Sequence, residues 1–155
     1  MFSQELLQAN LSRTFPVREI LYLSQTDSTN DEAWKCFQEG LTEGALILTD
    51  DQRRGRGRRS TQWFSVPGKS LTFSFFLLPE IERGKLGILP LLTGVSIVKG
   101  IQSSTAVKAG LKWPNDIMLR DKKMGGILIE TKSTKQGLVV VIGVGLNINE
   151  SESDI

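Results

Sequence analysis

The chain has 155 residues, of which 39% are hydrophobic and 23% are charged, so it can bury one sizeable core and is too short for two ordinary domains. It contains no histidine and one cysteine, Cys36, which excludes Ser-His-Asp and Cys-His catalysis, an internal disulfide and a multi-cysteine zinc site. The net charge is only +2, and we find neither a signal peptide nor an apolar run of about 20 residues, so we expect a cytoplasmic protein without a membrane partner.

The N-terminal third predicts a strand, a helix and a second strand. Residues 20–24 are short and apolar enough for a strand, and the DSTN cluster at residues 27–30 supplies side chains that cap helix N-termini. We expect the helix to run to about Glu39 and to be closed by Gly40, and a buried strand to follow over residues 45–49.

The remainder predicts one more strand, a long helix and four closely linked strands. Residues 70–78 have strand composition, with Phe73, Phe75 and Leu77 alternating. Residues 86–101 carry apolar side chains at helical spacing, namely Leu91, Leu92, Val95, Val98 and Ile101. Further strands are expected over residues 107–113, 117–120, 124–131 and 138–147. Short connections imply antiparallel neighbours, so the predicted fold class is α+β, a largely antiparallel mixed sheet flanked by helices.

Residues 50–69 have no sustained apolar period and are expected to form a functional loop. Within them, residues 52–63 read QRRGRGRRSTQW, with five arginines among residues 53–59. Gly55 and Gly57 free the backbone to fold around a ligand, and guanidinium groups suit phosphate and carboxylate. Composition alone gives equal weight to an anion-binding loop and to a basic tract that binds nucleic acid.

Two other segments have residues suited to nucleotide chemistry. In KWPND, residues 112–116, Lys112 ends a strand and can hold two anions together, while Asn115 and Asp116 offer oxygens to a hydrated magnesium ion; a solvated turn is the alternative. In GVGLNIN, residues 143–149, the glycines indicate close approach of a ligand or a bulge. The third glycine of a dinucleotide fingerprint is missing and no helical segment follows, so we do not expect a Rossmann site.

Together and in this order, the motifs resemble the biotin protein ligase family. They are Ser28-Thr29-Asn30, Gln52 with Gly55-Arg56-Gly57-Arg58-Arg59, Trp63-Phe64-Ser65, Lys112-Trp113-Pro114-Asn115-Asp116, Lys123-Met124-Gly125-Gly126-Ile127-Leu128 and residues 143–147. Their spacing covers roughly residues 20–149. The resemblance implies the catalytic-domain fold of biotin and lipoate ligases and an enzyme that activates biotin with ATP to biotinyl-5′-AMP, then transfers biotin to a lysine of a carrier protein.

The resemblance also implies a role for each site residue. Lys112 and Arg58 would be catalytic, where the biotin carboxylate meets the ATP phosphates. The biotin site would comprise Ser28, Thr29, Asn30, Gln52, Gly55, Arg56 (through its backbone), Arg58, Lys112, Gly126 and Gly143. The ATP or adenylate site would comprise Arg56, Arg58, Arg59, Trp63, Lys112, Asn115, Gly145 and Asn147, with Asn147 contacting adenine. Asp116 would bind magnesium.

By the same resemblance, ATP and Mg²⁺ are the expected cofactors, biotin the substrate, and the biotin carboxyl carrier protein of acetyl-CoA carboxylase the partner, with a homodimer left open. Residues 1–155 are read as a single catalytic domain without the small C-terminal β-barrel of other members. The roughly 19 residues before the first strand are too few for the winged-helix domain of the repressor members, so no DNA binding is expected. The chain has Ser60 where the family usually has glycine.

Three alternative functions stay open. A lipoate ligase or octanoyl transferase has the sister fold, although the 52–59 loop and the 113–116 turn favour biotin. A nucleic-acid-binding module built on the arginine loop would bind without ATP and weaken steeply with salt. A truncated form that senses biotin or biotinyl-adenylate without catalysis is the third.

Overall fold

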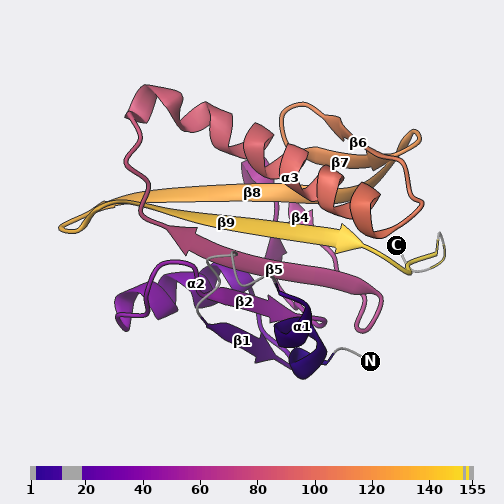
Figure 1. Cartoon of the computed structure of the whole chain (residues 1–155), viewed down its shortest axis with the longest axis horizontal. Coiled ribbons are helices and arrows are strands. Elements are labelled where there is room, and N and C mark those ends of the chain that lie inside the picture. The colour runs from indigo at the N-terminus through magenta and orange to yellow at the C-terminus, as the bar shows by residue number, and fades with distance from the viewer. Residues whose placement is uncertain (1–2, 12–18, 152, 154–155) are drawn as a thin grey trace.

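A seven-stranded sheet organises the chain (Figure 1). The computed structural model describes residues 3–11, 19–151 and 153. The strands lie in the order β1-β2-β5-β9-β8-β7-β6, with β1 and β2 parallel and every other neighbouring pair antiparallel. Their bounds are β1 Ile20–Leu23, β2 Leu46–Thr49, β5 Ser70–Leu77, β6 Ala109–Lys112, β7 Asp116–Leu119, β8 Lys122–Thr134 and β9 Gly137–Asn147. The α+β class and the largely antiparallel sheet are confirmed.

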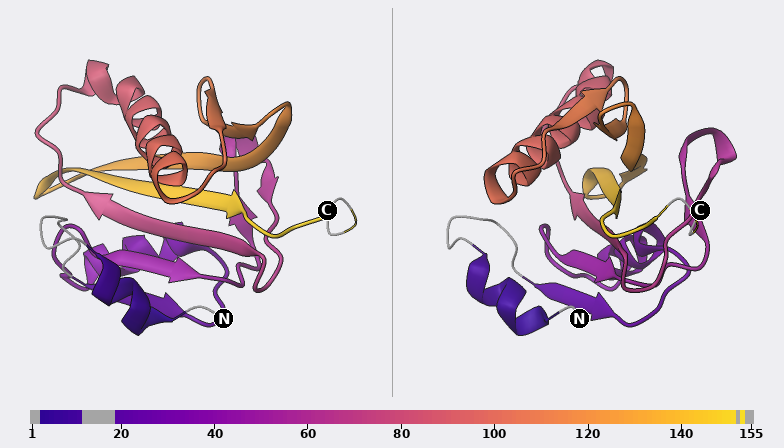
Figure 2. Two further views of the ribbon diagram at one scale, coloured as in Figure 1. Left: turned by 45° about the vertical axis from the view of Figure 1, so that its right-hand side comes forward. Right: turned by 90° about the vertical axis from the view of Figure 1, so that its right-hand side faces the viewer.

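The two long helices cover opposite faces of this sheet (Figures 1 and 2). Residues of α2 (Thr29–Gln38) pack with Val139 and Val141 of β9, whereas residues of α3 (Leu89–Ser104) pack with the alternate residues Val140, Ile142, Val144 and Leu146. Successive side chains of a strand point to opposite faces, so β9 is buried on both. The chain therefore has one core above the sheet and one below it.

The predicted helix after β1 is confirmed in detail. It occupies Thr29–Gln38, with Ser28 in extended conformation at its N-cap and Gly40 in the left-handed region at φ +85° just beyond its end. Gly40 can adopt this conformation because it lacks a Cβ. A short helix that the sequence did not predict, α1 (Gln4–Asn10), lies beside the edge strand, where the Gln4 amide donates to the Ile20 carbonyl at 3.1 Å.

The expectation of a loop over residues 50–69 is wrong for its central part. Gly55–Arg56 (β3) and Gln62–Trp63 (β4) form an antiparallel hairpin, and the 3₁₀ turn η1 (Arg58–Ser60) joins them. The Gly57 N–H donates to the Thr61 carbonyl at 2.7 Å and closes the hairpin. Two-residue strands without alternating apolar side chains leave no periodic signal, which explains the error.

The long apolar helix is confirmed, but only part of its predicted apolar face, Val98 and Ile101, packs on the sheet. The segment divides into the 3₁₀ helix η2 (Arg83–Ile88) and α3, and the side chains that pack on the sheet include Ile97, Val98 and Ile101. Leu91, Leu92 and Val95 are exposed instead. Gly94 explains the difference, because a Cβ at this position would lie 2.5 Å from the Leu111 side chain. Since glycine has no Cβ, the face of the helix that contains Gly94 can lie close to the sheet.

The segment Arg83–Ser104 also qualifies the expectation that no apolar run is long enough for a membrane span. These 22 residues, which comprise η2 and α3, meet the length and hydropathy of a span, and 11% of the most apolar window is buried. The segment contains three basic side chains, Arg83, Lys85 and Lys99. One side of α3 packs on the sheet, as in the helix of a two-layer fold.

Candidate functional site

A pocket of about 370 Å³ opens on the α2 side of the sheet. The N-terminus of α2, the β3–β4 hairpin and the turn between β6 and β7 form its walls, and β5, β8 and β9 form its floor. Thirteen of the residues proposed from the sequence line it: Ser28, Thr29, Asn30, Gln52, Arg56, Arg58, Arg59, Trp63, Asn115, Asp116, Gly126, Gly143 and Gly145. Segments separated by more than 100 residues therefore meet at one cavity of the size typical for small-molecule sites.

The floor arises where one face of the sheet changes from apolar to polar. Across β5 and β9, Phe76 pairs with Val141 in the core, and the next same-face pairs are Ser74 with Gly143, Thr72 with Gly145 and Ser70 with Asn147. Large side chains fill the first part, whereas hydroxyls and glycines leave space in the second. The sequence analysis noted the apolar Phe73, Phe75 and Leu77 of β5, but the opposite, hydroxyl-bearing face is the more buried one.

One end of the pocket presents neutral polar groups. The Gln52 side-chain carbonyl accepts from the Thr29 N–H at 2.8 Å and from the Thr29 hydroxyl at 3.2 Å. The Ser74 hydroxyl lies 2.7 Å from Thr29 Oγ1 and 2.6 Å from Asn30 Oδ1. All four residues are buried. Because the Gln52 oxygen is already used, its NH₂ group is the side of the amide that remains for a ligand.

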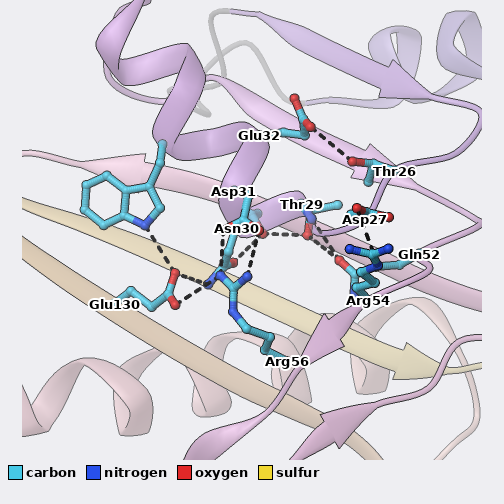
Figure 3. Close-up of polar contacts among 12 residues, drawn as sticks. Thr26, Asp27, Thr29, Asn30, Asp31, Glu32, Gln52, Arg54, Arg56 and Glu130 are labelled. Carbon is cyan, nitrogen blue, oxygen red and sulfur yellow. Dashed lines mark hydrogen bonds and ion pairs between the residues drawn. The ribbon is translucent and has the colours of Figure 1, made fainter. Parts of the chain in front are cut away.

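The guanidinium of Arg56 is held by carboxylates rather than left for an anion. It donates to both oxygens of Asp31 at 2.7 Å and to Glu130 at 3.2 Å (Figure 3). The bond from Arg56 holds the pKa of Asp31 below its usual range, and the same pair raises the pKa of Arg56. Arg56 therefore ties the β3–β4 hairpin to α2 and β8, which leaves its backbone as the part suited to a neutral ligand.

Arg58 and Arg59 give the pocket mouth its positive charge. Arg58 donates to the side-chain carbonyl of Asn115 at 3.1 Å and so reaches across to the β6–β7 turn. Within the described ranges, no carboxylate forms an ion pair with Arg58 or Arg59. Two guanidinium charges without a counter-charge beside a cavity are suited to a phosphate or carboxylate.

Trp63 covers the part of the floor nearest to Asn147. Its indole lies against Gly145, and its ring edge is 3.6 Å from the place where a Cβ of Gly126 would be. Trp63 Nε1, Thr72 Oγ1 and Asn147 Oδ1 are buried without a hydrogen-bond partner. Buried polar atoms are almost always bonded, so these three atoms are available to a ligand. Thr72 was not proposed from the sequence, because a threonine in a strand is unremarkable without its neighbours.

Three proposed residues lie outside the pocket lining. Lys112 is exposed at the end of β6, opposite Asp116 on β7, and neither Gly55 nor Asn147 is among the lining residues. A Cβ at Gly55 would lie 2.5 Å from Gln52 Nε2, so this glycine makes room for the Gln52 amide. Lys112 belongs to the rim of the site in this conformation.

The residues proposed for magnesium have other partners. Asp116 forms a 2.8 Å ion pair with Lys123, and the Asn115 carbonyl accepts from Arg58. Among the described residues, no group of three or more His, Cys, Asp or Glu side chains could hold a metal ion. The donor set around Asp116 therefore does not fit a resident magnesium site.

Sequence reasoning assigned no role to three charged residues at or near the pocket. Asp31 and Glu130 both form ion pairs with Arg56, and Lys123 forms one with Asp116. Glu130 had a detectable signal, since it is the one carboxylate in β8 and directly follows the apolar residues Ile127, Leu128 and Ile129. A charged residue within an apolar strand indicates that a specific partner is present.

Comparison with known proteins identifies similar chains. The sequence profile of the biotin/lipoate A/B protein ligase family matches residues 22–147. The chain is 35% identical over 138 residues to the bifunctional ligase/repressor BirA of Bacillus subtilis, covering 88% of this chain and 42% of that protein. It is 33% identical over 130 residues to the biotin--[acetyl-CoA-carboxylase] ligase of Paracoccus denitrificans, covering 81% and 53%. The chain thus spans about half the length of these relatives, or less.

Two solved structures share the fold and some sequence. The biotin protein ligase of Aquifex aeolicus, in complex with biotin and ATP, aligns with a TM-score of 0.73 and 32% identity over 87% of this chain and 54% of that one. The biotin acetyl coenzyme A carboxylase synthetase of Helicobacter pylori, with bound biotinylated ATP, aligns with a TM-score of 0.71 and 27% identity over 86% and 63%.

Proposed function

The chain belongs to the biotin/lipoate A/B protein ligase family, and from that premise we propose that it activates biotin with ATP to biotinyl-5′-AMP and transfers biotin to a lysine of a biotin carboxyl carrier protein. The observation that carries the proposal is the division of one pocket into a neutral polar end at Thr29 and Gln52 and a cationic mouth at Arg58 and Arg59. Solved neighbours that bind biotin with ATP, or biotinylated ATP, support it.

The neutral end suits the ureido ring of biotin, which carries one carbonyl oxygen and two N–H groups. The Gln52 amide can donate to the carbonyl, and hydroxyl oxygens such as that of Thr29 can accept from an N–H. A charged ligand would be disfavoured here, because burial penalises a charge without a partner. Lipoate has no ureido group, so the same donors and acceptors would be left unpaired with that ligand.

The cationic mouth suits the reacting groups. In the first step, a carboxylate oxygen of biotin attacks the α-phosphorus of ATP, the new O–P bond forms, and the bond to pyrophosphate breaks. Two anions must approach each other, so the enzyme has to align them and neutralise their charge. Arg58 and Arg59 supply charge at the pocket, and we assign Lys112, on the same rim as Asn115, to the crowded carboxylate and phosphate oxygens.

Magnesium enters this proposal as part of the MgATP substrate. Mg²⁺ commonly binds through substrate phosphates and retains several waters, so a dedicated protein cage is not needed. Asp116 would have to exchange its Lys123 partner to contact such an ion. No step is therefore assigned to a magnesium ion held by the protein.

In the second step, the amine of the carrier lysine attacks the carbonyl carbon of the mixed anhydride, and AMP leaves. We propose the biotin carboxyl carrier protein of acetyl-CoA carboxylase as the partner, since relatives bear the name of ligases for that enzyme. We propose a cytoplasmic location, which is compatible with the use of ATP and of such a carrier. We assign no role to DNA or to a membrane, and a homodimer is compatible with the reaction but not required by it.

The decisive experiment incubates the chain with biotin and MgATP and detects biotinyl-5′-AMP by mass spectrometry. A parallel reaction contains lipoate in place of biotin, and a third omits ATP. We expect the biotinyl adenylate only in the complete biotin reaction. Formation of lipoyl-AMP instead would assign the chain to the lipoate branch, and retention of biotin without any adenylate would identify a non-catalytic biotin-binding protein.

A further inference from the structure

We propose that Glu130 is a positioning residue for the neutral end of the pocket, where it fixes the orientation of the Asn30 amide and thereby the hydrogen-bonding pattern offered to the ligand. The inference rests on the proposed function and specifies how its biotin-binding end is organised. Glu130 is on β8, and the helix α2 that it contacts is about 100 residues earlier in the chain.

The carboxylate of Glu130 accepts hydrogen bonds from two elements at once (Figure 3). One oxygen accepts from Asn30 Nδ2 at 3.1 Å and from Trp34 Nε1 at 3.2 Å, both on α2, and the other accepts from Arg56 at 3.2 Å on β3. Asn30 and Trp34 are only 4% and 7% exposed, so neither donor can turn to water if the carboxylate is removed.

An ionised carboxylate only accepts hydrogen bonds, so it must face the NH₂ side of the Asn30 amide. Asn30 Oδ1 then faces Ser74, whose hydroxyl lies 2.6 Å away and has a single proton to donate. Because Asn30 Oδ1 cannot donate, that proton is directed to Asn30. The 2.7 Å contact between Ser74 and Thr29 then needs the proton of Thr29, so the Thr29 hydroxyl donates to Ser74 rather than to Gln52 at 3.2 Å, and Ser74 does not donate to Thr29.

The consequence appears at the ligand-binding surface. Thr29 Oγ1 receives no proton from Ser74, so its lone pairs remain available for an N–H of a ureido ring. The Thr29 N–H holds the Gln52 carbonyl at 2.8 Å, and the Gln52 NH₂ group remains available for the ureido oxygen. With the Asn30 amide reversed, Ser74 would donate to Thr29 instead and compete with the ligand.

The packing around Asn30 supports a fixed amide. A Cβ at Gly143 would collide with Asn30 Oδ1, so the amide is seated on bare backbone of β9. Gly143 pairs with Ser74 of β5 on one side and Leu128 of β8 on the other. The sequence motif containing Gly143 was read as room for the ligand, whereas in this structure Asn30 uses that room.

Anchoring of Arg56 is a separate role that can be tested apart. Asp31 accepts hydrogen bonds from Arg56 through both of its oxygens, whereas Glu130 accepts from Arg56 through only one. Asp31 is therefore the main anchor of that guanidinium. Asp31 has no hydrogen bond to Asn30 or Trp34 in the described part of the chain. Asp31→Asn is therefore the matched control for loss of one carboxylate beside Arg56.

The test compares Glu130→Gln, Glu130→Met and Asp31→Asn, with biotin affinity measured by calorimetry and the KM values for biotin and ATP measured from pyrophosphate release. Glutamine keeps an oxygen that can accept from Asn30 and Trp34, so we expect biotin affinity within about threefold of the unaltered chain. Methionine fills similar space without an acceptor, and we expect biotin binding to weaken by about tenfold or more while the KM for ATP stays unchanged. Asp31→Asn should bind biotin normally.

Several outcomes would overturn the inference. The inference is wrong if Glu130→Met binds biotin as tightly as the unaltered chain, or if the KM values for biotin and ATP rise together. It is also wrong if Glu130→Gln is as defective as Glu130→Met, because the effect then belongs to the charge. If Glu130→Met does not fold, Asn30→Ala removes the acceptor to which Ser74 donates, so biotin binding must weaken selectively, and adding Ser74→Ala, which removes the competing proton, must restore it. An unaltered chain that binds no biotin removes the proposed function and this inference together. Normal biotin binding by Glu130→Met, or by Asn30→Ala where Glu130→Met does not fold, removes the inference alone.

Discussion

The indole of Trp63, on the short strand β4, lies against the α-carbon of Gly145 in the long strand β9. A side chain at position 145 would occupy the space of the ring. The buried indole N–H has no hydrogen-bond partner, and neither do Thr72 Oγ1 and Asn147 Oδ1 on the same part of the floor. Trp63 thus covers a surface that contains two unused acceptors, and a nucleotide base that reaches them must contact or displace the indole.

Replacement of Gly145 by alanine tests this contact. A Cβ would overlap three atoms of the indole, so we expect Trp63 to move, the chain to lose about 1–3 kcal/mol of unfolding free energy, and adenylate binding to weaken. Gly110→Ala is the control, because no atom lies within 4 Å of its added Cβ and Gly110 is exposed. Denaturant unfolding and adenylate calorimetry measure both effects. If both variants have the same unfolding free energy and the same adenylate affinity, Trp63 can move aside without loss of stability or binding, and the contact has no role.

For Lys112→Ala, we expect biotin affinity within about tenfold of the unaltered chain and an adenylation rate lower by on the order of 10² to 10³. The neutral end of the pocket binds the ring without Lys112, whereas its charge matters where carboxylate and phosphate oxygens converge. Arginine should rescue poorly, because a planar fork does not replace a compact ammonium group. Calorimetry and pyrophosphate release separate binding from chemistry. Adenylation near the unaltered rate would make Lys112 a solvated strand-end residue, as its exposure in this structure allows.

Ser60 should be replaceable by glycine with a gain in stability. Ser60 has φ 62° and the preceding Arg59 has φ 52°, so two consecutive residues with side chains adopt the left-handed region. Such residues cost roughly 1–2 kcal/mol each, and glycine relieves that cost but adds entropy to the unfolded chain. We expect Ser60→Gly to raise the unfolding free energy by up to about 1 kcal/mol and Ser60→Val to lower it, because β-branching disfavours this conformation. Thermal melts that place both variants at the same midpoint would contradict the conformational argument.

Acid should weaken the tie between α2 and the β3–β4 hairpin. The hydrogen bond from Arg56 lowers the pKa of Asp31 in the folded state. The ion pair therefore contributes its full stability above the ordinary carboxyl pKa of about 3.9, and this contribution disappears as the pH falls through the lowered pKa of Asp31. Asp31→Asn should flatten that part of the stability profile below about pH 4. Asp27→Asn, which alters a more exposed pair with Arg54 at 3.8 Å, is the control. Unfolding free energies measured from pH 2 to 7 decide between them.

Local periodicity was enough to predict most elements of the fold, whereas most residues of the site were named by the family resemblance and not by residue type alone. The helix after β1, its closing Gly40 and the succession of antiparallel strands follow from caps and alternation within a few residues. Of the apolar positions predicted for α3, Val98 and Ile101 pack on the sheet, but Leu91, Leu92 and Val95 do not, because hydrophobicity does not reveal that Gly94 is the point of closest approach.

The relationships within the site depend on distant pairing, which a single sequence does not encode in any periodic way. Arg56 binds Asp31 and Glu130, which are 25 and 74 residues away in the chain. These distant partners give Arg56 a different role from Arg58. The same holds for the reach of Arg58 to Asn115 across 57 residues. Nothing in the arginine-rich motif distinguishes these two side chains until the hairpin is placed against α2 and the β6–β7 turn.

Strand β5 carries Phe73 and Phe75 on one face and Ser70, Thr72, Ser74 and Phe76 on the other. A shift of one residue in its pairing with β9 would turn the three hydroxyls toward the helix α3 and would turn Phe73 and Phe75 toward the ligand cavity. Folding in the wrong register would therefore abolish ligand binding and leave polar groups unpaired in the core at the same time. We therefore expect an insertion or deletion within β5 to abolish binding, whereas a change in length of the turn at residues 135–136, between β8 and β9, leaves both sets of side chains in place.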